Sequence, residues 1–377
     1  MGQAPAYIKN PSTHSGKLET WLGKEKIVEL QNATRGWYGK PIHILDVAGS
    51  VRVSADGDFT GRIENVGIYG AMDIMLETLE RFGRANPAVL NAGFSSISDA
   101  LSRASQGFQQ SFNGQIVKTG ATGVVGGCSS IWRLGAAPAA GAVGSAAPAG
   151  RATTSATTGA MTWNNSAAGT MRLTGADFNA SVINNTILIY DRLFDVAKTM
   201  NSSATESVTG VPTRYQSSTV TSEEYAGGNF CFPEVGGTQL AATAHNWTVC
   251  KYRNQAGTDS QIFPSFAGVS GKIVDNIDHL TAWFMPLASG DSGVMDLDQI
   301  QCDALVATGV LTFVIGHPVG FMSFPVINSV LPFDWLTNRN QAPYISNSAC
   351  LSLLEISKPT TTATTYTGRI YGTSTSS

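Results

Sequence analysis

The stretch Asp177–Met200, DFNASVINNTILIYDRLFDVAKTM, decides the fold that the sequence predicts. Its apolar residues recur at steps of three and four, a spacing that places them on one broad face of an α-helix. The polar residues between them would then face solvent. The pattern predicts a helix about 36 Å long lying on a core. The apolar residues are Val182, Ile183, Ile187, Ile189, Tyr190, Leu193, Phe194, Val196, Ala197 and Met200, and the polar ones are Asn184, Asn185, Asp191, Arg192, Asp195 and Lys198.

The chain before this stretch divides into three parts. Residues 1–68 predict an N-terminal arm followed by strands, among them PIHILDV (41–47) and SVRVS (50–54). Residues 69–113 predict a helical segment, with helices near 71–82 and 95–108. Residues 114–176 are rich in Gly, Ala, Ser and Thr, a composition that buries too little apolar surface to fold alone. This tract is an extended loop ordered by neighbouring subunits, an inserted domain or an idle disordered insert.

The chain after this stretch is rich in strand-like segments. Strands are expected near 229–234, 246–252, 280–285 and 305–315, and residues 295–309 are a candidate helix. Near the C-terminus, ACLSLLEIS (349–357) is a strand or a helix, and TYTGRIYG (365–372) is a strand. Together with the long helix, these segments predict the α+β class.

The composition favours a protein that associates with copies of itself. Only 14% of the 377 residues are charged and the net charge is −3, whereas about a quarter of an ordinary soluble domain is charged. The balance argues against a nucleic-acid reader with a basic face. A surface poor in charge and rich in small polar residues suits contact with other subunits. A secreted or phage-tail β protein would have a similar composition.

Cysteine usage and hydropathy indicate a protein made in a reducing cytoplasm. The five cysteines are widely spaced and form no C-x-x-C pair, so neither a disulfide framework nor a zinc site is expected. Free, buried thiols are the simplest interpretation. The N-terminal residues lack the apolar core of a signal peptide, and no apolar run approaches the ~18–20 residues of a membrane span.

No motif in the sequence reaches the level of an active site. Gly290–Gly293, GDSG, looks like the serine box of trypsin-like proteases, and the segment around His245 faintly echoes their histidine segment. However, Val294 follows the box where that family has glycine, so a polar turn is the better interpretation. Gly120–Gly127 lacks the Lys-Ser/Thr ending of a P-loop and is interpreted as flexible. The five histidines, which are His14, His43, His245, His279 and His317, have no second ligand at metal-binding spacing. We therefore assign no catalytic, cofactor-binding or metal-binding residue and expect no enzymatic activity.

Two segments resemble structural, head-type proteins of tailed bacteriophages. They are ILIYDRLFDVAKTMNSSATESVTGVPTRYQ (187–216) and FVIGHPVGFMSFPVINSVLPFDWLTNRNQAP (313–343), and the likeness spans roughly 177–372. The resemblance implies the Hong Kong 97-like capsid fold, with an N-terminal arm, an extended loop, a long spine helix, and peripheral and axial domains. On this mapping residues 114–176 are the extended loop or an insertion, and 177–230 hold the spine helix and peripheral domain. Residues 231–345 are then a β-rich axial domain, and 346–377 are C-terminal strands.

The same resemblance implies a function. The protein would be a major capsid protein that self-assembles, through hexamers and pentamers, into the icosahedral head enclosing double-stranded DNA. The protein would contact the packaged DNA non-specifically. Decoration, scaffolding and portal proteins are further candidate partners. No membrane or cofactor is implied. Localisation would be the virion, after synthesis in the host bacterial cytoplasm. The alternative is a phage tail, decoration or baseplate protein. A glycan-binding β protein, with Trp163, Trp247, Trp283 and Trp335 as candidate aromatics, and a hydrolase are more remote.

Overall fold

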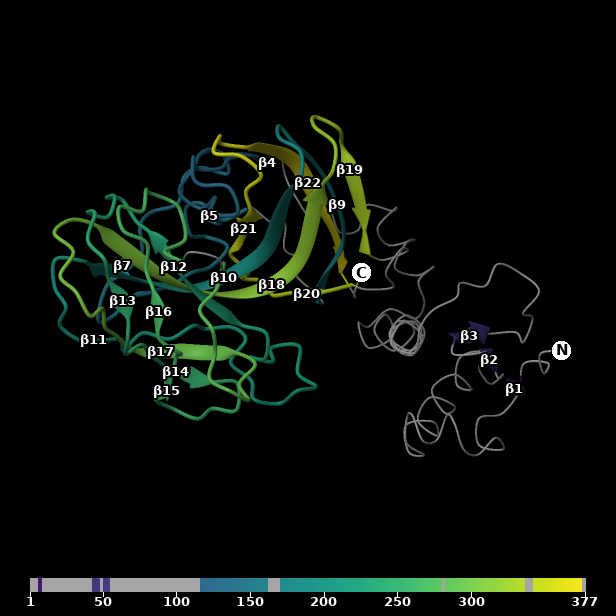
Figure 1. Cartoon of the computed structure of the whole chain (residues 1–377), viewed down its shortest axis with the longest axis horizontal. Coiled ribbons are helices and arrows are strands. Elements are labelled where there is room, and N and C mark those ends of the chain that lie inside the picture. Colours follow the sequence, from purple (N-terminus) through teal and green to yellow (C-terminus); the bar gives the residue numbers. More distant parts are fainter. Residues whose placement is uncertain are drawn as a thin grey trace. The chain divides into compact units, whose positions relative to one another are not determined.

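A computed structural model of the chain describes residues 6–8, 43–47, 50–54, 116–161, 170–279, 282–335 and 342–374. The chain divides into two compact units, one formed by Met1–Leu101 with Trp335–Ala342 and the other by Ser102–Asp334 with Pro343–Ser377. All secondary-structure elements of the described residues are β-strands (Figure 1).

The strands of the first unit are β1 (Ala6–Ile8), β2 (His43–Val47) and β3 (Ser50–Ser54). The second unit contains β4 (Ile116–Thr119), β5 (Ser129–Ser130), β6 (Ala136–Ala137), β7 (Ser145–Ala146), β8 (Arg151–Ala152), β9 (Met171–Ala180), β10 (Asn185–Thr199), β11 (Glu206–Ser207), β12 (Phe230–Val235), β13 (Asn246–Trp247), β14 (Lys251–Asn254), β15 (Gln261–Ile262), β16 (Phe266–Ala267), β17 (Val294–Ile300), β18 (Val310–Phe324), β19 (Leu331–Asp334), β20 (Tyr344–Ile345), β21 (Leu351–Ser357) and β22 (Thr365–Ser374).

The predicted α+β, Hong Kong 97-like fold is wrong for the described part of the chain. The stretch predicted to be a spine helix forms the end of β9, a turn at 181–184 and the 15-residue strand β10. Five of its six polar residues do not face solvent, because all but Asn184 are buried; they are Asn185, Asp191, Arg192, Asp195 and Lys198. A strand covered on both faces gives a nearly continuous apolar run, and such a run cannot be told from a helix by its period. The charged residues of buried ion pairs interrupt this run. In the sequence their spacing resembles the solvent-facing side of an amphipathic helix.

Several other predicted strands are present in the structure, and one candidate helix is a strand. Strands β2 and β3 confirm the predicted strands at 41–47 and 50–54, and β12 and β22 lie where strands were expected. Residues 349–357, predicted as a strand or a helix, contain strand β21. Residues 295–300, a candidate helix, belong to strand β17. The predicted helices near 71–82 and 95–108 lie outside the described residues.

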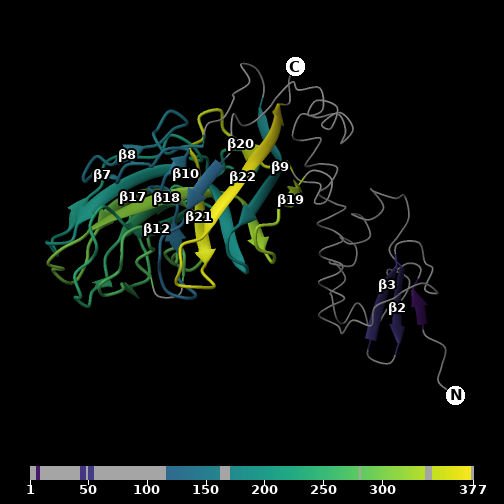
Figure 2. The same cartoon turned by 90° about the horizontal axis from the view of Figure 1, so that it is seen from above.

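The second unit is organised around two sheets (Figures 1 and 2). In the first, which we call the β10 sheet, the order is β12-β18-β10-β21-β5, and β7 and β8 also pair with β10. In the second, the β9 sheet, the order is β19-β9-β22-β4-β6, and β20 also pairs with β9. The turns 181–184 and 325–330 each lead from one of these sheets to the other. Two smaller sheets, β11-β17-β14-β15 and β13-β16, complete the unit.

Strand β10 changes partners halfway along one edge. It pairs with β18 along its whole length, with register shifts at Ile189/Tyr190 and Arg192/Phe194. On its other edge, residues 186–191 pair with β21, whereas 194–197 pair with β8 and β7. The Gly/Ala-rich tract supplies β7 and β8. These two strands form hydrogen bonds with the backbone groups of β10 that do not pair with β21.

The described part of the Gly/Ala-rich tract, residues 116–161, supplies strands to both large sheets, β4 and β6 to the β9 sheet and β5, β7 and β8 to the β10 sheet, and does not form an extended loop. Trp132 is fully buried, and its indole N–H donates to the carbonyl of Ala142 at 2.9 Å. A methyl group on Gly141 would overlap the Trp132 ring. Small residues therefore let the backbone approach a large aromatic side chain, and the composition reflects close packing as well as low apolar content.

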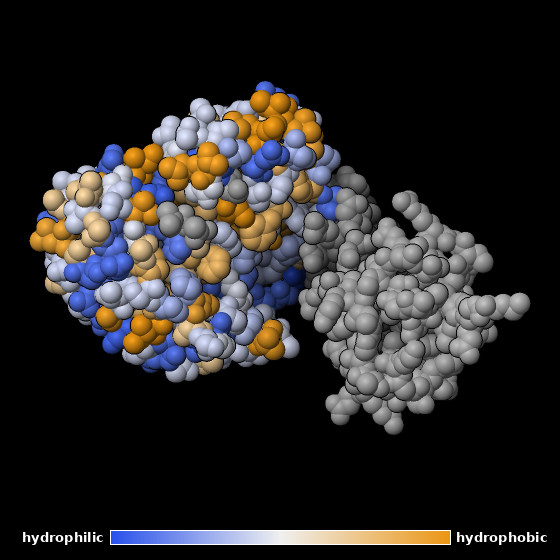
Figure 3. Space-filling view, in the orientation of Figure 1, coloured by the Kyte–Doolittle hydropathy of each residue, from blue (hydrophilic) through white to orange (hydrophobic). Residues whose placement is uncertain are grey.

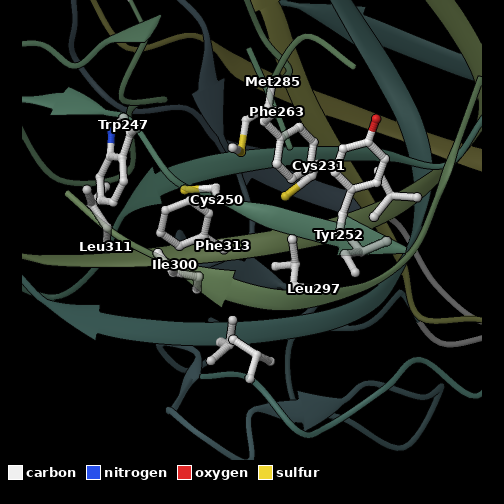
Figure 4. Close-up of a cluster of buried hydrophobic side chains, with 14 of the residues drawn as sticks. Cys231, Trp247, Cys250, Tyr252, Phe263, Met285, Leu297, Ile300, Leu311 and Phe313 are labelled. Carbon is white, nitrogen blue, oxygen red and sulfur yellow. The ribbon is translucent and has the colours of Figure 1, made fainter. Parts of the chain in front are cut away.

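The main hydrophobic core lies between β10, β18, β17 and β14 (Figure 4). It contains seven buried aromatic side chains and three cysteines. Its members include Cys231, Trp247, Cys250, Tyr252, Phe263, Leu297, Cys302 and Phe313. All five cysteines of the chain are free and buried, as predicted. Burial raises the pKa of the Cys128 thiol to about 11 and those of Cys250 and Cys350 to about 12.

Replacing Leu193 with Asp tests the assignment of this residue of β10 to the main hydrophobic core. Leu193 is fully buried in the main core, and a carboxylate there would lose its hydration without gaining a partner. We expect Leu193→Asp to lower the free energy of unfolding by more than about 4 kcal/mol, measured by denaturant titration followed by circular dichroism. Thr199→Asp, at the exposed end of the same strand, should cost less than about 1 kcal/mol. Equal losses in the two variants would contradict the assignment.

Candidate functional site

The buried charged residues of β10 form the most unusual polar cluster of the described chain. The Arg192 guanidinium is fully buried and donates to Asp195 at 3.0 Å and to Glu234 of β12 at 2.8 Å. Its Cζ lies 4.7 Å from the ring centroid of Trp132. Arg151 of β8 donates to both carboxylate oxygens of Asp195, at 2.7 and 3.1 Å, and shares Oδ2 with Arg192. Two cations and two anions thus balance each other, which is the condition for burying charge.

A second buried pair joins β10 to three distant segments. Arg214 donates to both carboxylate oxygens of Asp191, at 2.6 and 3.0 Å, and to the carbonyl of Thr153 at 2.7 Å. The backbone N–H of Cys350 donates to Asp191 at 2.8 Å. Burial raises the pKa of Asp191, and the charge and hydrogen bonds of Arg214 oppose that rise without cancelling it. The arrangement positions backbone segments and has no open side for a substrate in this geometry.

Breaking this pair from one side should be costly. Asp191→Asn would leave the buried Arg214 guanidinium without its counter-charge, so we expect a loss of about 3–5 kcal/mol in the free energy of unfolding. Asp259→Asn is the control, because Asp259 is 74% exposed and lies 3.9 Å from Arg253; it should cost less than about 1 kcal/mol. Denaturant titrations measure both. A loss at Asp191 no larger than that at Asp259 would show that the pair does not hold the segments together.

The structure does not assemble the protease-like residues into a catalytic site. His245 Nε2 lies 2.9 Å from Asp278 Oδ2, and its Nδ1 lies 3.0 Å from the carbonyl of Thr243. Both ring nitrogens therefore face acceptors. Burial lowers the pKa of His245, but Asp278 more than compensates, so the net pKa is raised and the imidazolium is favoured. Because both ring nitrogens are held by these acceptors, neither is directed at a serine hydroxyl to take its proton.

Ser292 is fixed by hydrogen bonds of its backbone to residues other than His245. Its N–H donates to the Gln255 side chain at 2.9 Å and its carbonyl accepts from Gly228 at 2.7 Å. The neighbouring Asp291 carboxylate accepts from Tyr252 at 2.6 Å and from Asn254 at 2.7 Å. The GDSG segment thus begins in a turn, as predicted. Its polar groups bind Tyr252 and Asn254 of β14 and Gln255, which follows β14.

The histidines of the described residues are not grouped as metal ligands. Of the residues that the structure describes, no group of three or more His, Cys, Asp or Glu is arranged to hold an ion. His317 stacks on Tyr215, with ring centroids 3.8 Å apart, and its Nδ1 donates to Asn229 Oδ1 at 2.8 Å. Asn229 Oδ1 is the acceptor because its amide nitrogen donates to the carbonyls of Tyr215 and Val294. Burial lowers the pKa of His317 to about 4.

This lowered pKa predicts a loss of stability in mild acid. Between its usual pKa of 6.5 and about 4, the imidazole of His317 is protonated in the unfolded chain but not in the folded one. The folded state therefore loses up to about 1.4 kcal/mol per pH unit as the pH falls through this window. We expect the melting temperature to fall less steeply between pH 7 and pH 4 for His317→Gln than for the wild type. Glutamine keeps a hydrogen-bond donor and does not titrate. The comparison is needed because Asp275 and Asp296, with pKa values raised by burial to about 6, shift stability in the opposite direction. Parallel curves for the two proteins would contradict the assignment.

An exposed apolar surface lies where the chain passes between the two large sheets. We call it the apolar end; it consists of Ile183 (43% exposed), Val326 (49%), Ile327 (51%) and Val330 (56%). The two turns that carry these residues are bonded to each other's strands, Asn328 N–H to the carbonyl of Ala180 at 2.9 Å and Asn184 N–H to that of Phe324 at 2.7 Å. Figure 3 shows apolar surface gathered at the upper right of the coloured body, over the region of β19 and β22. Clustered exposed aliphatic side chains of this kind mark contact surfaces.

No signal in the sequence separated these residues from core residues. FPVINSV reads as an apolar strand end, and its exposure follows from the turn at 325–330. No helix of the described residues is long and apolar enough to cross a membrane.

Comparisons with known proteins identify no family. No protein-family model matches the chain, and no curated protein matches it. A search of solved structures found the crystal structure of the infectious bursal disease virus VP2 subviral particle, with a TM-score of 0.11 and 9% sequence identity, covering 71% of this chain and 81% of that one. A score this low indicates neither a shared fold nor a shared function.

Proposed function

We propose that this protein is a structural subunit of a virus particle, a major capsid protein whose copies enclose the double-stranded DNA of a bacteriophage. The observation that carries the proposal is the apolar end, four exposed aliphatic side chains on two turns that are fixed by hydrogen bonds. Exposed apolar area on a rigid support gains free energy when another surface covers it. The occupant we propose is a second copy of this chain.

The composition supports the same proposal. With 14% charged residues and a net charge of −3, the surface loses little hydration when it is buried, and the overall charge does not attract DNA to the protein. In a closed symmetric shell each weak contact is repeated in every copy, so modest surfaces suffice. The likeness of 187–216 and 313–343 to phage head proteins agrees with this function, although the fold that the likeness implied is not the one observed.

Charged substitutions in the apolar end test the proposal. We expect the wild-type chain, when concentrated, to form closed shells in negative-stain microscopy and a fast-sedimenting species in analytical ultracentrifugation. The double variant Val326→Glu with Ile327→Glu would place carboxylates in the contact. Each contact should weaken by about 3 kcal/mol, about a hundredfold, so the variant should sediment as small species with an unchanged melting temperature.

The control is Val220→Glu, at a residue that is 72% exposed in another turn. This variant should assemble like the wild type. Shells from the double variant, or loss of assembly in both, would show that the apolar end is not the contact. Open tubes or rings from the wild type would favour the tail, decoration or baseplate alternative.

A further inference from the structure

The β10 sheet closes on itself through a short segment of the chain. Residues 275–278 pair with both of its edge strands, by the isolated bridges Ser129↔Asn276 to β5 and Glu234↔Ile277 to β12. The order β12-β18-β10-β21-β5 therefore returns to its own beginning, and we call the result the closed sheet. Side chains on its inner face are surrounded by strands and are removed from bulk solvent.

The inner face of the closed sheet carries apolar residues first and charged residues after them. Tyr190 of β10 contacts Phe230 and Phe232 of β12, with ring centroids 5.7 and 5.9 Å apart. Side chains two residues apart lie on the same face of a strand. Arg192 therefore follows Tyr190 on the inner face, and Glu234 follows Phe232. The ion pair between Arg192 and Glu234 lies beside the aromatic cluster.

Three polar atoms in this region have no hydrogen-bond partner among the described residues. They are Arg192 Nη1, Glu234 Oε2 and the Tyr190 hydroxyl, and the three side chains are at most 1% exposed. Arg192 uses Nε for Asp195 and Nη2 for Glu234 Oε1, so one nitrogen and one oxygen of the same ion pair remain. A buried polar group without a partner costs about 1–3 kcal/mol, and a charged one costs more.

The three atoms lie close to one another. Nη2 of Arg192 and Oε1 of Glu234 are 2.8 Å apart, and each is bonded to the same carbon as the unpartnered atom of its own group. Burial raises the pKa of Tyr190 to about 12, and the charges of both Arg192 and Glu234 act on its hydroxyl. The hydroxyl is therefore protonated at neutral pH and lies beside the ion pair.

The chemistry of these atoms selects the ligand that fits them. It must accept a hydrogen bond from Arg192 and donate one to Glu234. It must also be neutral, because Arg192 and Arg151 already balance Asp195 and Glu234, and an ion would add a charge without a partner. Water meets these conditions, and a buried water typically forms about three hydrogen bonds to polar groups that lack other partners.

We propose that the closed sheet binds a structural water molecule at this point. The water accepts from Arg192 Nη1, donates to Glu234 Oε2 and forms its third hydrogen bond with the Tyr190 hydroxyl. It supplies the remaining partners of the buried charges, which is the condition for burying them. Because strands surround the site, the water exchanges with solvent only when the sheet opens. The inference goes beyond the proposed assembly function, because it concerns one chain and holds whether or not copies associate.

A high-resolution crystal structure of the full-length wild-type protein tests the proposal. We expect a density peak of the strength of one water at about 2.7–3.2 Å from both Arg192 Nη1 and Glu234 Oε2. A direct hydrogen bond between these two atoms, or bonds from both to other protein groups, would overturn the proposal. A peak too strong for water, such as that of a bound anion, would overturn it as well. The wild-type structure decides the question even if a variant fails to fold.

Magnetic relaxation dispersion of the water oxygen tests the same site in solution, since it counts waters that stay bound for longer than the protein takes to rotate. The double variant Arg192→Met with Glu234→Leu replaces the ion pair by apolar side chains, a change that folded proteins often tolerate. We expect it to hold one long-lived water fewer than the wild type. An unchanged count in a folded double variant would contradict the proposal.

The control is Lys198→Met with Glu206→Leu, which removes another ion pair of β10. Lys198 Nζ donates to Glu206 at 2.7 Å and to the carbonyl of Ala204 at 3.2 Å. Neither side chain has an unpartnered buried atom among the described residues. This variant should therefore keep the wild-type number of long-lived waters. An equal loss in both double variants would show that the water is not specific to the site at Arg192 and Glu234.

Discussion

The constraint on which the rest of the structure depends is the burial of four charged side chains along the second half of β10, from Asp191 to Lys198. Asp191, Arg192, Asp195 and Lys198 all lie within one strand whose two faces are covered. A buried charge is tolerated only with a counter-charge and further hydrogen bonds. The partners come from segments that are far apart in the sequence. They are Arg151 from the Gly/Ala-rich tract, Glu206, Arg214 and Glu234 after β10, and the backbone of Cys350.

This dependence explains why the tract and the sheets form one folding unit. Until β8, β12 and the segment containing Arg214 are in place, the strand would hold unpaired charges in an apolar core. Partial structures are therefore disfavoured, and the ion pairs select one arrangement of these segments in addition to any stability they add. The glycines at Gly141 and Gly123 serve the same close packing, at Trp132 and beside Asn276 and Lys358.

The extent of successful prediction follows from the same physics. Segments with ordinary strand patterns, such as 50–54, 230–235 and 365–372, were found from the sequence because residue type and period indicate them directly. Strand β10 was misread because Arg192 and Asp195 are polar in the sequence but interior in the structure, and their partners are visible only in three dimensions. The predicted absence of a protease site rested on local context, and the structure adds that His245 pairs with Asp278, a residue 33 positions away. Neither the apolar end nor the close approach of Gly123 to Asn276 and Lys358 could be predicted, since each depends on the folding of distant segments.

The five buried thiols can report on local opening of the folded protein through their rates of alkylation. Since burial holds their pKa values high, the thiolate that an alkylating reagent needs is scarce until a segment opens. Cys128 lies with Leu354 and Val314, Cys350 with Trp132, and Cys231, Cys250 and Cys302 in the main core. Cys128, Cys350 and the three cysteines of the main core therefore report on three different clusters. The order in which they become labelled would rank the local openings of the body from the most frequent to the rarest.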